Sequence, residues 1–67
     1  MTGDELLRRL RRSGCQVLRR RGSHVRLRCG DCLATVPVHP GRDIPVGTLR
    51  SIERQLESCL GKGWLKR

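Results

Sequence analysis

The alternation of apolar and polar residues between positions 24 and 38 constrains the fold of this chain more than any other feature. Apolar side chains recur at every second position over residues 24–29 and again over residues 32–38, which indicates two strands that each bury one face. Gly30-Asp31 lies between them as a two-residue hairpin loop, so opposite residues have numbers that sum to 61. The register gives three apolar pairs on one face: Val25–Val36, Leu27–Ala34 and Cys29–Cys32.

The other face of this predicted hairpin is polar. Its residues are His24, Arg26, Arg28 and Pro37, and His39 follows just past the strand. In a two-layer domain the helices cover the apolar face, so we expect the His24 face to stay open.

A first helix is predicted over residues 3–13. Thr2-Gly-Asp-Glu5 has the form of a capping box, with a hydroxyl three residues before a carboxylate. Leu6, Leu7 and Leu10 then share one helical face, and Gly14 is a natural C-cap. A strand over residues 15–20 follows and ends at the turn that begins with Arg21-Gly22.

A second helix is predicted over residues 48–60, with Thr48 as its N-cap and Gly61 at its end. Its apolar residues recur at helical spacing: Leu49, Ile52, Leu56 and Leu60. The element order is therefore α-β-β-β-α. We expect an α+β fold of one domain, residues 1–67, with an antiparallel three-stranded sheet, two helices on one face and a short C-terminal tail.

The charge of the chain points to a polyanion as partner. Fifteen Lys and Arg residues face six Asp and Glu residues, for a net charge of +9. A basic, solvated surface without a ligand is the plain alternative. With one Trp and no Tyr or Phe, base stacking is poorly supplied, which favours recognition of RNA shape and backbone. The candidate RNA-binding residues are Arg8, Arg11, Arg12, Arg19, Arg20, Arg21 and Ser23.

His24 is the candidate catalytic residue. It follows a Gly-Ser turn and shares the open face with Arg26 and Arg28, which are placed to hold a phosphate beside it. Histidine exchanges protons near neutral pH, which suits general acid–base cleavage of RNA. His39 is a possible auxiliary group; ordering the turn before the second helix is an equally good role for it.

The four cysteines, at positions 15, 29, 32 and 59, are expected to be reduced, because no secretory signal is recognised. Cys29-Gly-Asp-Cys32 has zinc-ligand spacing but lacks a second pair of ligands, so no metal and no cofactor are predicted. No apolar run is long enough to span a membrane.

Three segments resemble the HicA toxins of bacterial toxin–antitoxin modules. They are Gly22-Ser23-His24, Val36-Pro37-Val38-His39-Pro40-Gly41 and Gly47-Thr48-Leu49-Arg50-Ser51-Ile52. The resemblance covers roughly residues 4–60. It implies a fold like that of double-stranded-RNA-binding domains, cleavage of messenger RNA, catalysis by His24 and neutralisation by a HicB-type antitoxin that covers the His24 face. The cytoplasmic location is expected from the composition, which includes no apolar run typical of a signal peptide.

The sequence therefore predicts a small, metal-independent toxin ribonuclease, either monomeric or bound to its antitoxin. A non-catalytic RNA-binding module on the same basic surface is the alternative function. A zinc- or thiol-dependent interaction domain built on the cysteines is a third.

Overall fold

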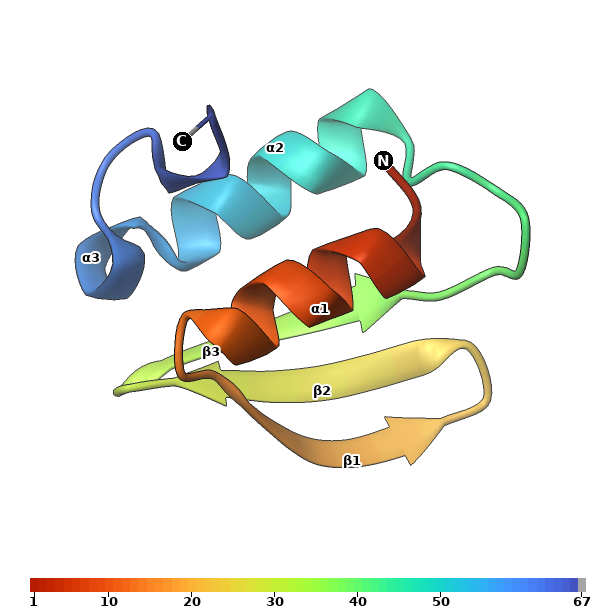
Figure 1. The fold of residues 1–67 in the computed structure, drawn as a ribbon, viewed down its shortest axis with the longest axis horizontal. Helices are drawn as coiled ribbons and strands as arrows, with labels where there is room; N and C mark the ends of the chain where they lie inside the picture. The colour runs from red at the N-terminus through yellow and green to blue at the C-terminus, as the bar shows by residue number, and fades with distance from the viewer. Residues whose placement is uncertain (67) are drawn as a thin grey trace.

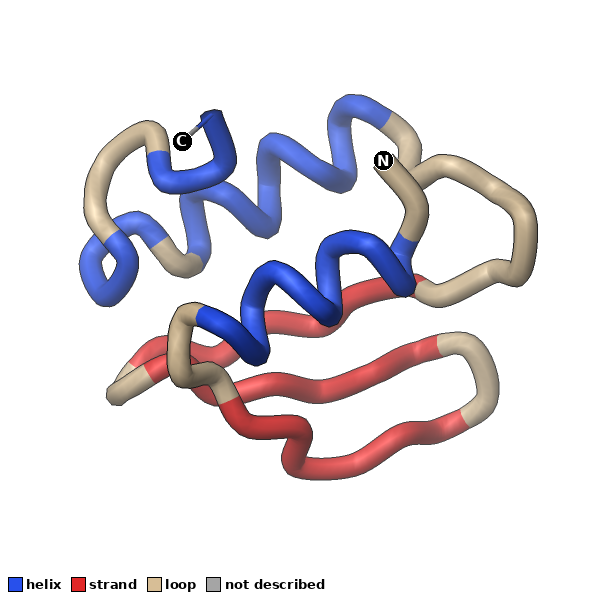
Figure 2. Tube along the Cα trace, in the orientation of Figure 1, coloured by secondary structure: helices blue, strands red, loops and turns tan. Residues whose placement is uncertain are grey.

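Three antiparallel strands form one layer and the helices form a second layer on one side of it, in the computed structural model of residues 1–66 (Figures 1 and 2). In chain order the elements are α1 (Gly3–Arg12), β1 (Gln16–Arg21), β2 (His24–Cys29), β3 (Cys32–Pro37), α2 (Val46–Gln55), α3 (Glu57–Leu60) and the 3-10 turn η1 (Trp64–Lys66). The predicted α+β class and its α-β-β-β-α layout are confirmed. Arg67, the last residue of the predicted domain, lies outside the described residues.

The predicted register of the β2–β3 hairpin is confirmed. Val25 pairs with Val36, Leu27 with Ala34 and Cys29 with Cys32, and the apolar members of this face are buried or half-buried. Gly30 has a φ of 60° in the loop, a backbone conformation that favours glycine. β3 ends at Pro37, one residue earlier than predicted.

β1 lies at one edge of the sheet, in the order β1-β2-β3, and covers residues 16–21 in place of the predicted 15–20. Its pairing with β2 shifts between Val17 and Arg19, so Leu18 forms a β-bulge. Every residue of β1 is exposed. No helix therefore covers this strand in the way that helices cover β2 and β3.

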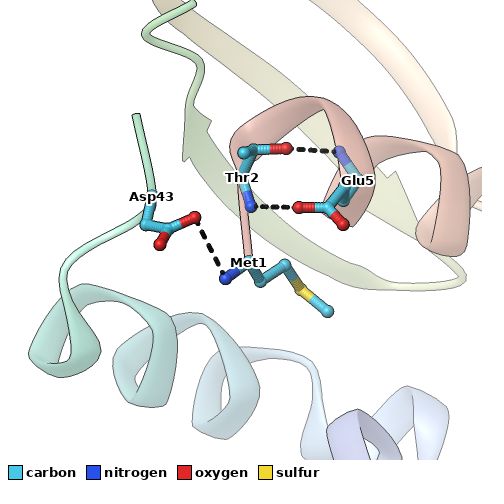
Figure 3. Close-up of polar contacts among 4 residues, drawn as sticks. All are labelled: Met1, Thr2, Glu5 and Asp43. Atoms are coloured by element: carbon cyan, nitrogen blue, oxygen red, sulfur yellow. Dashed lines mark hydrogen bonds and ion pairs between the residues drawn. The ribbon is translucent and has the colours of Figure 1, made fainter. Parts of the chain in front are cut away.

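The predicted capping box at the start of α1 is confirmed (Figure 3). The Thr2 hydroxyl oxygen accepts from the Glu5 N–H at 3.2 Å, and the Thr2 N–H donates to Glu5 Oε1 at 2.7 Å. The Met1 amino group also lies 3.3 Å from Asp43 Oδ1, and the Ile44 N–H donates to the Met1 carbonyl at 2.8 Å. These contacts tie the start of α1 to the loop before α2.

The second helix begins two residues before the predicted start. Pro45 is the N-cap, and its carbonyl accepts the first helical bond from the Leu49 N–H at 2.9 Å. Thr48 therefore lies inside α2, and the prediction that it caps the helix is wrong. The predicted single helix over 48–60 is also interrupted at Leu56, where the backbone leaves helical geometry before α3.

The core lies between the helices and the inner face of the sheet. Its most completely buried large side chains are Leu6, Leu10, Val25, Leu27, Val36, Ile52 and Leu56. Trp64 joins this core from η1: its indole N–H donates to the Glu53 carbonyl at 2.9 Å, and its own carbonyl accepts from Arg9 Nη2 at 3.0 Å. The C-terminal tail is therefore packed. No helix in residues 1–66 is long and apolar enough to cross a membrane.

The prediction of reduced cysteines is wrong, because the structure contains two disulfide bonds: Cys15–Cys29 and Cys32–Cys59. Cys29 and Cys32 face each other across the hairpin, as the register requires, but each bonds to a cysteine outside it. Cys15 arrives from the α1–β1 connection and Cys59 from α3. With all four sulfurs bonded, no thiolate within residues 1–66 is free to bind zinc, and no metal-binding group of His, Cys, Asp or Glu occurs there.

Candidate functional site

His24 is the first residue of β2 and lies exposed on the side of the sheet away from the helices. It follows the Gly22-Ser23 turn, in which Gly22 has a φ of 59°. The Ser23 carbonyl accepts from the Val38 N–H at 2.6 Å, which holds this turn against the end of β3. The position of His24 is therefore fixed from both neighbouring strands.

The strand register defines the residues that share the open face with His24. Arg21 pairs with His24, Arg19 with Arg26, and Gln16 with Arg28. Across the other ladder, Pro37, Thr35 and Leu33 pair with the same three β2 residues. The open face thus consists of Gln16, Arg19, Arg21, His24, Arg26, Arg28, Leu33, Thr35 and Pro37. It includes four arginines and no acidic residue.

Two of these arginines are held in place by neighbouring strands. Arg26 Nη1 donates to Thr35 Oγ1 at 3.0 Å, and Arg28 Nη2 donates to Gln16 Oε1 at 3.3 Å. A guanidinium has five N–H donors, so these bonds orient each group and leave it able to bind an anion. Thr35 and Gln16 were not among the predicted site residues. The predicted hairpin register already placed Thr35 opposite Arg26, so Thr35 could have been found. Gln16 could not, because the bulge at Leu18 shifts the pairing of β1 with β2.

Successive residues of the run Arg19-Arg20-Arg21 point to opposite faces of the sheet, and the bulge at Leu18 sets which face each one takes. Arg19 and Arg21 belong to the open face, whereas Arg20 pairs with the buried Val25 and lies on the helix side. There it lines a depression together with Arg8 and Arg11 of α1. Arg12 lies elsewhere on α1 and lines a different depression with Arg9 and Glu5.

The predicted RNA-binding residues therefore form two groups on either side of β1. Arg19 and Arg21 accompany His24, while Arg8, Arg11 and Arg20 face each other between α1 and β1. Arg12 belongs to neither group. Ser23 is half-buried, and the turn uses its backbone carbonyl.

His39 is exposed in the loop after β3, at the same end of the sheet as His24. Its carbonyl accepts from the Arg42 N–H at 3.0 Å, so its backbone takes part in the turn that leads to α2. This contact belongs to the backbone, so it does not require a histidine at this position.

A family model described as the HicA toxin of bacterial toxin–antitoxin systems matches residues 3–57, which is most of the chain. The chain therefore belongs to the HicA toxin family, as its motifs predicted. It is a toxin of a toxin–antitoxin module, in which an antitoxin is its partner. No curated protein and no solved structure matches the chain.

Proposed function

We propose that this toxin is an endoribonuclease that cleaves messenger RNA, with His24 as its catalytic residue. The observation that carries the proposal is the composition of the open face: an exposed histidine among Arg19, Arg21, Arg26 and Arg28, with no carboxylate on the same face. Such a surface attracts the phosphates of RNA and presents a proton acceptor beside them. Cleavage of messenger RNA accounts for inhibition of translation and growth, in the cytoplasm where messenger RNA is translated.

The reaction needs one base and a positively charged phosphate site. The His24 imidazole takes the proton of a ribose 2′-hydroxyl, and that oxygen attacks the adjacent phosphorus. The P–O5′ bond breaks, which leaves a 2′,3′-cyclic phosphate and a 5′-hydroxyl that gains a proton from water or from His39. Arg26 or Arg28 stabilises the negative charge that builds on the phosphate oxygens. No step requires a metal ion.

The test is incubation of the purified toxin with a structured messenger RNA in EDTA, followed by mapping of the RNA ends. We expect cuts with cyclic-phosphate ends that disappear in His24→Ala, while circular dichroism shows an unchanged fold. His39→Ala in parallel tests the imidazole alone, because the variant keeps the backbone carbonyl that accepts from Arg42; a lower rate at unchanged stability would identify a proton donor. Equal cutting by His24→Ala would refute the mechanism. Repeating the assay in a translating extract tests whether the ribosome is required.

A non-catalytic RNA-binding module is the second candidate function. One observation favours it: no group within residues 1–66 hydrogen-bonds to the His24 ring, whereas Arg26 and Arg28 are both oriented. Catalytic imidazoles are commonly oriented by a hydrogen bond to the second ring nitrogen. Gel shifts without new RNA ends, unchanged in His24→Ala, would support this function over cleavage.

The antitoxin partner is of the HicB type, and it covers the open face. Burial of four arginines requires compensating negative charge, so the contacting segment of the antitoxin is acidic. We include in this proposal that the fold is like that of double-stranded-RNA-binding domains, because the α-β-β-β-α order of elements is the observation that supports the likeness.

A further inference from the structure

The helix side of β1 is left uncovered, because α1 packs against β3 at the far edge of the sheet. Val17 and Arg20 point to this side and are exposed. The surface is therefore hollowed between α1 and β1. It forms a depression of about 520 Å³ lined by Asp4, Leu7, Arg8, Arg11 and Arg20, which we call the α1–β1 cleft.

The cleft carries positive charge from two separate elements. Arg8 and Arg11 are three residues apart and lie on the same side of α1, and Arg20 faces them from β1. Asp4 is the one carboxylate in the lining, so the cleft keeps a surplus of two positive charges. Leu7, only 7% exposed, contributes apolar surface beside them. Guanidinium groups that converge from two directions suit a phosphate, which they can bind through several oxygens.

The two walls of the cleft are fixed relative to each other. The Cys15 N–H donates to the Leu10 carbonyl at 3.0 Å, directly after the end of α1. The Cys15–Cys29 disulfide then fastens the start of β1 to the end of β2. The connection between α1 and β1 is therefore held by a covalent bond, so the backbone segments that carry the arginines keep their relative position. Arg20 Nε also donates to the Gly22 carbonyl at 3.4 Å, which leaves its terminal N–H groups able to bind an anion.

We propose that the α1–β1 cleft binds a backbone phosphate of the RNA substrate, away from the scissile phosphate at His24. This inference rests on the proposed function and adds a second contact to it. Arg20 lies between Arg19 and Arg21 on one strand but on the opposite face. One RNA strand that passes around the exposed edge of β1 therefore contacts the cleft on one side and the open face on the other.

The composition of the cleft makes the contact independent of base sequence. It contains no aromatic side chain, and Trp64, the single aromatic residue of the chain, is buried in the core. Phosphate contacts position a nucleic acid without reading its bases. An RNA long enough to reach the cleft should therefore bind more tightly and be cut more efficiently than a short one. The base sequence of the segment in the cleft should make no difference.

The first experiment measures binding without cleavage. Fully 2′-O-methylated RNA is titrated with the wild type and with Arg8→Gln, Arg11→Gln and Arg20→Gln over a range of salt concentrations. Each variant should bind about three- to tenfold more weakly, and the slope of log affinity against log salt should fall by about 0.7–0.9 for each lost phosphate contact. Arg54→Gln removes the same charge from an exposed position that lines a different depression and serves as the control. Equal losses in the control and the cleft variants would overturn the proposal.

The second experiment separates the cleft from the catalytic site. With a long RNA, Arg20→Gln should raise KM about five- to tenfold and leave kcat within about twofold, because the cleft does not touch the reacting atoms. With a dinucleotide, which cannot reach the cleft, the variant and the wild type should cut alike. If the wild type cuts RNA and Arg20→Gln has the same KM, the cleft proposal is refuted and the ribonuclease proposal stands. Absence of cutting by the wild type both as purified protein and in a translating extract, with weaker binding by the cleft variants, refutes the ribonuclease proposal and leaves the cleft as an RNA contact.

Discussion

Gly3 lets the first turn of α1 lie directly against the backbone at the end of β3. A Cβ at this position would meet the Pro37 carbonyl oxygen and would lie 2.8 Å from Val38 Cα. Both are backbone atoms, which cannot rotate away as a flexible side chain can. This close approach holds α1 to the strand end that pairs with His24 and precedes His39.

Gly3→Ala should lower the free energy of unfolding by about 1–3 kcal/mol, since overpacking must shift the backbone. Gly47→Ala is the matched control, because a Cβ there meets nothing within 4 Å and Gly47 is also in a helix. It should be neutral or stabilising by about 0.5 kcal/mol. Urea denaturation of both variants checks this, and equal stabilities would contradict the close approach.

The capping box makes part of the stability of α1 depend on pH. The pKa of the Glu5 carboxyl lies below its ordinary value of 4.5, chiefly because the Thr2 backbone N–H donates to it, with a smaller effect of the Thr2 side chain. A lowered pKa means that the stabilisation is complete above the unfolded pKa and is lost as pH falls through the folded pKa.

We therefore expect Glu5→Gln to flatten the fall in melting temperature between about pH 5 and about pH 3, since the amide can still accept the bond but does not titrate. Asp31→Asn, in the hairpin loop, removes one carboxyl without touching the capping box. A melting curve that responds to acid equally in both variants would show that the capping box does not contribute.

At the scale of elements, local periodicity predicted the helices, the strands and the pairing of β2 with β3. It did not predict the exact ends of the elements or the contacts between distant segments. The β2–β3 register followed from loop length and alternation, because one slip would move Val25 and Val36 to the open face. Alternation along a strand places Arg19 and Arg20 on opposite faces, but the Leu18 bulge has no sequence signal, so which of the two shares the face of His24 could not be foreseen. α2 has Pro45 as its N-cap and no side-chain cap, so the capping role expected of the Thr48 hydroxyl does not exist in the fold.

The disulfides were missed because the cysteines were expected to be reduced in a protein without a secretory signal, and the distances between them were not known. The predicted register already placed Cys29 and Cys32 at the end of the sheet, but it gave no position for Cys15 or Cys59 relative to them. Sequence separation alone does not decide which cysteines meet. For the candidate site, the sequence predicted the β2 residues of the open face, His24, Arg26 and Arg28. It did not predict that Arg19 and Arg21 of β1 share that face.

Each disulfide should contribute about 3–4 kcal/mol to stability, given sequence separations of 14 and 27 residues. Cys59 is exposed whereas Cys15 and Cys29 are buried, so a thiol reductant should open Cys32–Cys59 first. Alkylation with mass spectrometry during a reductant titration checks the order. Simultaneous reduction of both bonds would indicate global unfolding as the route of access.

At the scale of the whole molecule, positive charge is the property that an antitoxin has to compensate. The chain carries +9, and the open face has no carboxylate of its own to offset its arginines. Most of that charge lies on the surface, which gives a long-range attraction to acidic partners and to RNA alike. From the proposed function we expect RNA and the antitoxin to compete for this surface.

The antitoxin should therefore protect the β2 amides near His24 from hydrogen exchange and should block RNA binding. Its association rate should fall as salt is raised, because surface charges are screened. Arg21→Gln and Arg28→Gln should each weaken the complex, and Arg54→Gln should not. Contact with α1 alone, with RNA binding intact, would refute coverage of the open face.

β1 has one further consequence, for what the toxin does in the absence of any partner. It is an edge strand, and an uncovered edge is the usual place where two copies of a protein join into a larger sheet. Here such a junction would bring together two runs of three consecutive arginines, each preceded by a bulge at Leu18 that disturbs the strand. The positive charge of β1 thus also keeps toxin molecules apart at this edge, so we expect the free protein not to join into a larger sheet through β1 when its antitoxin is removed.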